Sequence, residues 1–141
     1  MLISCSSSDK NIKIWSIYTF ECIKILAGHS NTINSLEATA NGRLISCSTD
    51  KSVKLWQIET GKMLETIQFD CSVNCLKILT DDLIAIGLDS GKIQIYDLSK
   101  CKTLKIISAH VLNLFQLNFL SNKNLMSVCG NGEIKLWKIF D

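Results

Sequence analysis

The chain has 141 residues, of which 47% are hydrophobic and 20% are charged, and its formal net charge is +2. The lysines are dispersed, so the sequence does not predict the basic patch on which nucleic-acid or membrane-surface binding depends. No apolar run approaches the roughly 20 residues of a membrane span and the first residues lack the pattern of a signal peptide, so we expect a cytoplasmic protein.

Short apolar runs with a period of two residues, typical of half-buried strands, follow one another along the chain. No helical period is sustained, so the expected fold class is all-β. In chain order, we expect strands near residues 2–6, 12–15 and 22–26, then 31–39, 43–48, 52–57 and 63–68, then 72–79, 83–88, 92–97 and 103–108, and finally 112–120, 124–129 and 133–139.

The strands recur with a period of about forty residues. Trp15, Trp56, Tyr96 and Trp137 are spaced 41, 40 and 41 residues apart, which is typical of a propeller array with roughly 40–45 residues per blade. We therefore predict a partial β-propeller of four-stranded antiparallel blades, incomplete in its first and last blades. Its units span 1–28, 29–68, 69–109 and 110–141.

Neighbouring copies in such an array must cover each other's apolar faces. We therefore expect the indoles of Trp56 and Trp137 to be buried between sheets. This covering explains why apolar residues recur in matched places in the third strand of each unit, namely Ile12, Ile14, Val53, Leu55, Ile93, Ile95, Ile134 and Leu136. At both ends of a partial array no further unit covers the sheet, so we expect exposed apolar faces and unpaired edges there.

The seven cysteines do not predict a metal or a disulfide framework. Cys5, Cys47 and Cys129 occupy corresponding places in three units and are interpreted as small core residues. Cys71 and Cys75 stand four residues apart, without the second pair that a zinc site needs. Glycine-rich phosphate loops and calcium loops are missing as well, so we expect no cofactor and no metal.

Several residues of the second unit carry a family resemblance. Gly28-His29, Ser46-Cys47-Ser48, Asp50 and Leu55-Trp56 resemble the WD-repeat β-propeller family, as does the aromatic-acid pair Tyr96-Asp97 in the third unit. The match is incomplete in the other units: Phe69 stands in the place of His29, and Ser90 and Asn131 stand in the place of Asp50.

The resemblance implies a buried hydrogen-bond chain from histidine through a serine and the turn aspartate to the tryptophan. Its members in the second unit are His29, Ser46 or Ser48, Asp50 and Trp56. In the fourth unit they are His110, Ser127, Asn131 and Trp137, and in the first unit only Asp9 and Trp15.

A Ser-His-Asp set also raises the alternative of a hydrolase, but no nucleophile elbow or oxyanion loop accompanies it. A structural role is therefore favoured, and we expect no enzyme activity.

The resemblance further implies partner-facing positions three and five residues after the histidine and one residue before the turn acid. These candidate partner-binding residues are Thr32, Asn34, Thr49, Ser72, Asn74, Asp89, Asn113, Phe115 and Gly130.

Two function classes stay open. The first is a non-catalytic scaffold or adaptor that binds proteins or peptides, without nucleic acid or membrane. The second is a structural segment that completes a ring by self-association or by pairing with another half-propeller. A propeller enzyme is the least favoured alternative. Because the first unit lacks its innermost strand while the last stops after its third, we interpret the chain as the C-terminal half of a larger WD-repeat ring of about seven blades.

Overall fold

The structure, a computed structural model, describes residues 1–6 and 8–140. These residues form β-strands joined by turns, and none of them belongs to a helix that could cross a membrane. The strands are β1 (Leu2–Cys5), β2 (Ile12–Trp15), β3 (Cys22–Leu26), β4 (Ile33–Ala38), β5 (Arg43–Ser48), β6 (Ser52–Gln57), β7 (Met63–Gln68), β8 (Val73–Ile78), β9 (Leu83–Leu88), β10 (Lys92–Asp97), β11 (Lys102–Ser108), β12 (Leu114–Phe119), β13 (Asn124–Cys129) and β14 (Ile134–Lys138).

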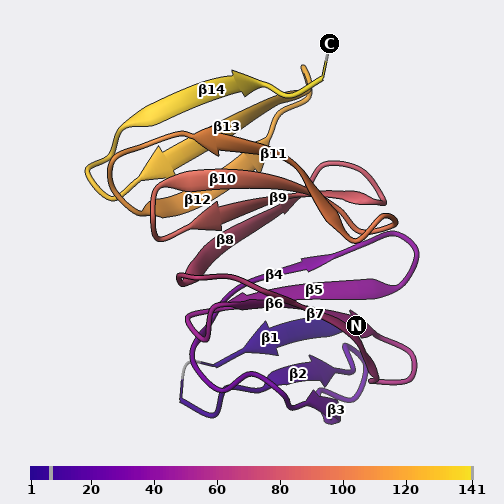
Figure 1. Ribbon diagram of the computed structural model, residues 1–141. Coiled ribbons are helices and arrows are strands. Elements are labelled where there is room, and N and C mark those ends of the chain that lie inside the picture. Colours follow the sequence, from indigo (N-terminus) through magenta and orange to yellow (C-terminus); the bar gives the residue numbers. More distant parts are fainter. Residues whose placement is uncertain (7, 141) are drawn as a thin grey trace.

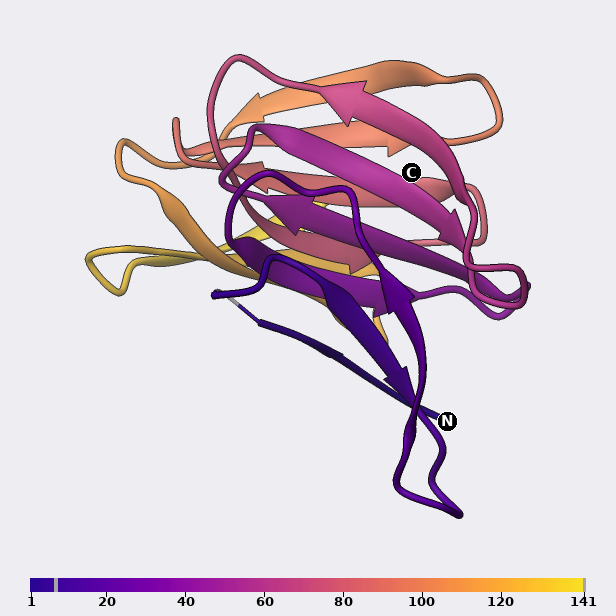
Figure 2. The ribbon, with the colours of Figure 1, turned by 90° about the horizontal axis from the view of Figure 1, so that it is seen from below.

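The strands form four separate antiparallel sheets that follow one another along the chain. The sheets are β1-β2-β3, β4-β5-β6-β7, β8-β9-β10-β11 and β12-β13-β14. Figure 1 shows them stacked in chain order, with the first and last sheets at opposite ends of the stack, and Figure 2 shows the stack from below. The expectation of an all-β partial propeller with three-stranded first and last blades is confirmed.

The core lies between the sheets, because alternation along each strand gives every sheet two apolar faces. One cluster joins Ile12 and Ile14 of the first sheet to Leu44 and Trp56 of the second. Similar clusters join the second sheet to the third and the third to the fourth. In all three interfaces the third-strand residues of the earlier sheet are at most 5% exposed, namely Ile12, Ile14, Val53, Leu55, Ile93 and Ile95.

The outer face of the last sheet is exposed, as expected at an end of a partial array. Ile134 and Leu136 of β14 are 61% and 62% exposed, because no further sheet of the described residues packs on that face of β12-β13-β14. Trp137 lies on the opposite face and packs against the core cluster between the third and fourth sheets, as expected. Its indole is half-buried rather than buried like that of Trp56, since the described part of the fourth unit has no fourth strand beside β14.

The three cysteines that were interpreted as core residues differ in burial. Cys47 and Cys129 are buried, as expected of core residues, but Cys5 is exposed. Cys5 lies at the end of β1, in the three-stranded first sheet. The expectation that Cys47 and Cys129 hold corresponding places was wrong: Cys129 pairs with Leu114 as Ser48 pairs with Ile33, so Cys129 corresponds to Ser48.

The turn between the second and third strands of each unit has a residue in the left-handed region. Lys10, Lys51, Gly91 and Gly132 occupy this one repeat position with φ of 58°, 68°, 75° and 83°. Left-handed backbone costs little for glycine and roughly 1–2 kcal/mol for other residues. The repeat therefore fixes the backbone shape of this turn even where the residue is lysine.

Candidate protein-binding site

A buried hydrogen-bond chain joins two loops of the second unit. Trp56 Nε1 donates to Ser46 Oγ at 2.8 Å, His29 Nε2 lies 2.7 Å from the same oxygen, and His29 Nδ1 lies 2.7 Å from Asp50 Oδ2. An indole nitrogen only donates, and a carboxylate only accepts. The Ser46 hydroxyl therefore donates a hydrogen bond to Nε2, and Nδ1–H donates to Asp50.

Asp50 is held from several sides. Its Oδ1 accepts from the Ser52 hydroxyl at 2.6 Å, and its Oδ2 accepts from Ser30 N at 3.0 Å. Burial works to raise the pKa of Asp50, but the hydrogen bonds from Ser52, His29 and Ser30 outweigh it and lower the pKa below its usual 3.8. Burial lowers the pKa of His29 below 6.5 despite the opposing effect of Asp50. The pair is thus a neutral imidazole donating to a carboxylate.

Ser46 and Ser48, which the sequence left as alternatives, have separate roles. Ser46 is the member of the chain, since it bonds both His29 and Trp56. The Ser48 hydroxyl donates to Asn31 O at 3.1 Å and accepts from Asp50 N at 3.0 Å. Ser48 therefore shapes the turn that carries Asp50.

The fourth unit repeats the chain with a different acid. Ser127 Oγ lies 2.8 Å from His110 Nε2 and accepts from Trp137 Nε1 at 2.8 Å. The placement of Asn131 in this chain was wrong: Glu133 Oε2, two residues further on, lies 2.8 Å from His110 Nδ1. The longer glutamate side chain reaches the histidine from the far side of the turn, where Asn131 Oδ1 accepts from Glu133 N at 3.0 Å.

The first unit has only part of the chain. Trp15 Nε1 donates to Ser4 Oγ at 2.8 Å, so Ser4 takes the place of Ser46, although the sequence analysis did not name it. Asp9 forms an ion pair with Lys13 at 2.7 Å and accepts from Asn11 N. Asp9 therefore shapes its turn without a histidine partner.

None of these serines is placed as a nucleophile. Ser46 and Ser127 are fully buried, and each hydroxyl already accepts an indole N–H. A nucleophilic serine must reach a substrate carbonyl. The geometry is that of a structural network, and every buried side-chain nitrogen and oxygen of the described residues has a hydrogen-bond partner.

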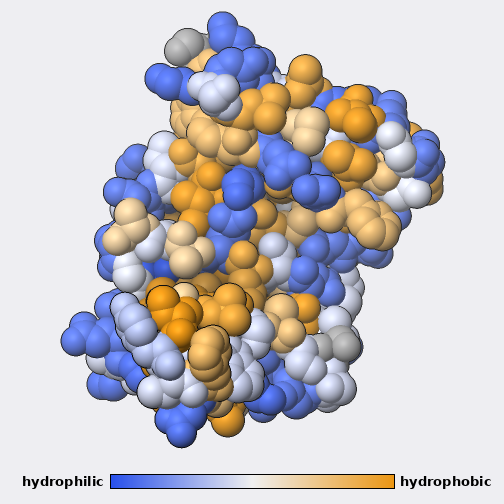
Figure 3. Space-filling model, turned by 180° about the vertical axis from the view of Figure 1, so that it is seen from behind, coloured by the Kyte–Doolittle hydropathy of each residue, from blue (hydrophilic) through white to orange (hydrophobic). Residues whose placement is uncertain are grey.

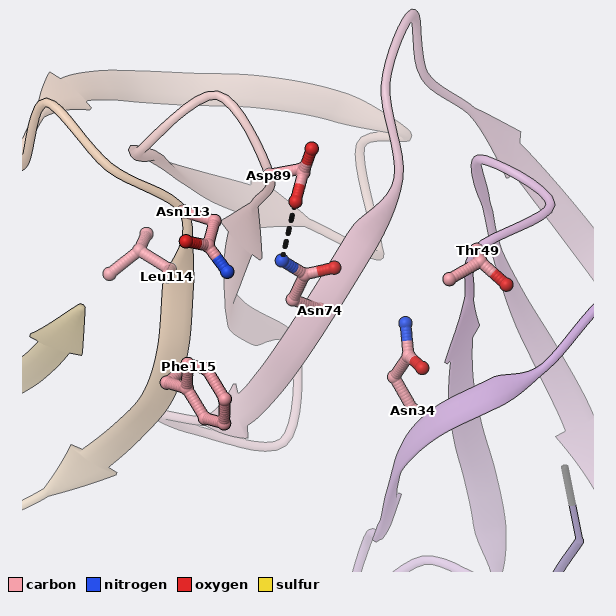
Figure 4. A pocket seen from close by; sticks show the side chains of 7 residues that line it. All are labelled: Asn34, Thr49, Asn74, Asp89, Asn113, Leu114 and Phe115. Atoms are coloured by element: carbon pink, nitrogen blue, oxygen red, sulfur yellow. Dashed lines mark hydrogen bonds between the residues drawn. The ribbon is translucent and has the colours of Figure 1, made fainter. Parts of the chain in front are cut away.

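An open pocket of about 380 Å³ lies where three sheets meet (Figure 4). Its walls come from β4, β8, the start of β12 and two turns between strands. The residues that line it are Asn34, Thr49, Asn74, Asp89, Asn113, Leu114 and Phe115. Six of them are predicted partner-binding residues, which the repeat brings together because each holds a corresponding place in its own unit.

The other three predicted residues, Thr32, Ser72 and Gly130, do not line the pocket but support its walls. Thr49 N donates to Thr32 O at 3.0 Å, and the Ser72 hydroxyl donates to Thr49 O at 3.4 Å. Gly130 N donates to Asn113 O at 3.0 Å, and a Cβ on Gly130 would meet Asn113 Oδ1 at 2.6 Å. Gly130 thus allows the close approach of Asn113.

The pocket combines one carboxylate, several amides and one exposed aromatic ring. Asn74 Nδ2 donates to Asp89 Oδ1 at 3.1 Å, the bond drawn in Figure 4, and Asn34 Nδ2 donates to Val73 O at 2.8 Å. Both amide NH₂ groups therefore donate to acceptors within the protein. Phe115 is 68% exposed, so its ring is not part of the core.

A second, smaller hollow continues the pocket along the inner strands and shares Asn34, Asn74 and Phe115 with it. Glu37 and Lys77 lie in its wall and form an ion pair at 2.7 Å across two sheets. Their charges compensate each other, so Asp89 gives the surface its negative character. The sequence analysis missed this pair because its members come from different units.

Comparisons with known proteins agree with this architecture. A family model described as "WD domain, G-beta repeat" matches residues 20–57. Pre-mRNA-processing factor 19 of Bos taurus is 29% identical over 104 residues, which cover 70% of this chain and 21% of that protein. WD repeat-containing protein 75 of Homo sapiens is 32% identical over 113 residues, which cover 77% of this chain and 14% of that protein. The chain therefore spans about a fifth, or less, of the length of these relatives.

Solved structures show the same fold. The WD40 β-propeller domain of Doa1 superposes with a TM-score of 0.85 at 22% identity, covering 95% of this chain and 45% of that chain. The computationally designed Ika4 protein gives a TM-score of 0.85 at 24% identity, covering 98% of this chain and 84% of that chain. The sheets and their polar network define a β-propeller of repeated units. Residues 20–57 carry a WD repeat, and the described sheets have the fold of a WD-repeat β-propeller.

Proposed function

We propose that the chain is a non-catalytic scaffold or adaptor module that binds proteins or peptides in the pocket around Phe115 and Asp89. The observation that carries the proposal is the 68% exposure of Phe115 at the rim of a concave, mostly polar pocket. Exposed aromatic side chains in such settings are typical anchors of protein interfaces. The chain is similar to Pre-mRNA-processing factor 19 and to Autophagy-related protein 16 of Arabidopsis thaliana, and the scaffold role proposed for it is an extension from such relatives.

The chemistry of the pocket favours one class of ligand. Asp89 offers a carboxylate to a cationic side chain, and the inward-directed amides of Asn34 and Asn74 leave their carbonyl oxygens to accept hydrogen bonds. Phe115 offers an apolar surface, and an aromatic face also attracts a cation. A peptide with a lysine or arginine next to an apolar residue fits this arrangement. The carboxylate would repel phosphate groups, which supports proteins rather than nucleic acids or membrane surfaces as partners.

A selection from a displayed peptide library tests this function. We expect enrichment of peptides with a basic residue beside an apolar one, and loss of their binding in Phe115→Ala and in Asp89→Asn. Tyr18→Ala is the matched control, because Tyr18 is 88% exposed and does not line the pocket. Binding that survives Phe115→Ala and Asp89→Asn, or is lost equally in Tyr18→Ala, would contradict the proposal.

A second candidate function, ring completion by a second copy, is favoured by the exposure of Ile134 and Leu136. Their counterparts Val53 and Leu55, in the same repeat positions, are 0% and 5% exposed because the next sheet covers them. At the other end of the stack, Leu2 and Ile25 of the first sheet are 60% and 58% exposed. Figure 3 shows hydrophobic surface near both ends of the molecule.

We also propose an intracellular location for the protein. Imaging of the tagged protein in cells tests this location, and secretion would contradict the proposal.

A further inference from the structure

Three side chains with metal-binding atoms meet in the fourth unit. His110, Cys129 and Glu133 each place one such atom within 4.8 Å of the other two. His110 precedes β12, Cys129 ends β13, and Glu133 lies in the turn before β14. The histidine and the cysteine are buried, whereas the glutamate side chain is 44% exposed. The cluster is therefore held firmly on two sides and open to solvent on the third.

The second unit shows what this cluster has replaced. Residues of the fourth unit correspond to those of the second with a constant offset of 81, so that His110 matches His29, Ser127 matches Ser46 and Trp137 matches Trp56. The three retained pairs lie on the Nε2 side of the histidine.

The residues on the Nδ1 side have all changed. Ser48, Asp50 and Ser52 correspond to Cys129, Asn131 and Glu133. A carboxylate to orient the imidazole is present in both units, so that role alone does not require a thiol. The changes replace two hydroxyl groups and a short acid by a thiol, an amide and a long carboxylate, beside the retained histidine nitrogen.

We infer that His110 Nδ1, Cys129 Sγ and the Glu133 carboxylate form a binding site for a divalent transition-metal ion of the zinc type. Zinc prefers histidine nitrogen, cysteine thiolate and carboxylate oxygen, in a tetrahedral arrangement. Three protein ligands leave the fourth position for water or for a side chain of a partner. Sequence reasoning did not find the site because its three ligands do not follow a Cys-Cys or His-His spacing.

Two of the three ligand distances are close to those that zinc requires, and the third, between His110 Nδ1 and Cys129 Sγ, is at most 4.8 Å. With zinc bond lengths of roughly 2.0–2.3 Å, a tetrahedral ion separates its nitrogen and oxygen ligands by roughly 3.3 Å and its sulfur and oxygen ligands by roughly 3.6 Å. Cys129 Sγ lies 3.9 Å from Glu133 Oε2, close to the required value. His110 Nδ1 lies 2.8 Å from Glu133 Oε2, so the solvent-exposed glutamate must move by about half an ångström.

Proton and charge balance also fit. When the ion binds, the imidazole stays neutral but its proton moves to Nε2, where Ser127 Oγ accepts it together with the indole N–H of Trp137. The Ser127 hydroxyl, which donated to Nε2 before, must then turn its own proton away from the imidazole. The Cys129 thiol gives up its hydrogen bond to Asn131 Oδ1 and loses its proton to solvent. The thiolate and the carboxylate together neutralise the divalent charge, while Lys135 Nζ contacts the other carboxylate oxygen, Glu133 Oε1, at 3.2 Å. One proton is thus released for each ion bound.

Binding would stiffen one wall of the proposed peptide pocket. Cys129 and Asn131 flank Gly130, whose N–H bonds Asn113 O in that wall. The site itself rests on its own ligands and does not depend on peptide binding.

Cobalt(II) titration of the purified reduced protein, followed by zinc competition, tests the site. We expect one cobalt ion per chain, with the near-ultraviolet absorption of a cobalt–thiolate bond, displaced by zinc with release of cobalt. Cys129→Ser should abolish this absorption, and it places at this position the serine that the second unit carries there. Cys101→Ser is the matched control, because Cys101 is also a free cysteine but is exposed and outside the cluster.

A second variant covers the case in which Cys129→Ser does not fold. Glu133→Gln keeps an oxygen acceptor for His110 but provides a poor ligand, so we expect cobalt affinity to fall by about tenfold or more, with the thiolate absorption retained at saturating ion. Absence of a cobalt–thiolate band in the unmodified protein, or a band that persists in Cys129→Ser, would overturn the inference, as would unchanged affinity in Glu133→Gln.

Discussion

Asp50 Oδ2 lies 2.7 Å from His29 Nδ1, and the same oxygen accepts the backbone N–H of Ser30. The aspartate in the β5–β6 turn thereby fixes the segment that leads into β4. In the third unit, Ser90 stands at the corresponding position, and its hydroxyl has only a long contact of 3.7 Å with Cys71 Sγ. The two positions are equivalent in the repeat but differ in the interactions that depend on them.

The first prediction compares these two positions. Asp50→Ala removes the acceptor of a buried imidazole N–H, and an unsatisfied buried group costs about 1–3 kcal/mol. Ser90→Ala removes no such partner and should cost distinctly less. Urea unfolding at neutral pH, followed by tryptophan fluorescence, measures both free energies. Equal shifts of the two midpoints would show that the Asp50 network contributes no particular stability.

The second prediction concerns Gly91 and Gly132, which share one repeat position and similar positive φ values of 75° and 83°. A Cβ on Gly91 would lie 2.2 Å from His110 O and 2.7 Å from Leu112 O, whereas a Cβ on Gly132 meets nothing within 4 Å. Gly132→Ala should therefore cost only the backbone strain of about 1–2 kcal/mol.

Gly91→Ala should cost considerably more, since the colliding atoms are backbone and the loop that carries His110 must move. Thermal unfolding of the two variants compares them directly. If Gly91→Ala were as mild as Gly132→Ala, the contact between the β9–β10 turn and the His110 loop would not be as close as the structure has it.

The order and number of strands could be predicted from sequence because alternation and the forty-residue period are local signals. The His29–Asp50 pair followed as well, since both residues match the repeat. The role of Glu133 could not be predicted in this way. Glu133 lies two residues beyond the repeat position of the acid, and it reaches His110 only because its side chain is long enough to cross the turn. The exposure of Ile134 followed from the place of its unit at an end of the array, because burial in this fold is decided by the neighbouring sheet and not by a residue's own strand pattern.

The third prediction concerns acid sensitivity. The pKa of His29 is lowered below 6.5 by burial, and the pKa of Asp50 is lowered below 3.8 by hydrogen bonds that outweigh burial. Both groups therefore bind fewer protons in the folded than in the unfolded state, and the free energy of unfolding must fall as pH falls. His29 contributes to this loss below about pH 6.5, and Asp50 below about pH 3.8.

Urea unfolding across a pH series measures this dependence. His29→Gln should lose the part of the slope that begins near pH 6.5 while keeping the remaining acid dependence. A protein that becomes more stable on acidification through this range, or an unchanged slope in His29→Gln, would show that the imidazole is not held neutral.

The last prediction is that the outer face of β12-β13-β14 associates with the outer face of β1-β2-β3 of a second copy. Ile134 and Leu136 occupy the positions of Ile93 and Ile95, which are 0% and 3% exposed against the following sheet, and full burial of one such side chain stabilises by roughly 1.5–3 kcal/mol. Because the two faces differ, each contact is head-to-tail. Two copies form a closed, symmetric pair if the last sheet of each copy can contact the first sheet of the other at the same time.

Light scattering coupled to size exclusion should therefore give a mass that rises with concentration from 15.7 kDa toward twice that value. Ile134→Lys should remain a single chain, because a lysine on this face would bury a charge in the contact. Ile106→Lys is the control: Ile106 has a similar exposure of 57% but lies on β11, the outer strand of the third sheet. A mass of one chain at every concentration, or equal effects of the two lysine variants, would mean that these faces do not meet.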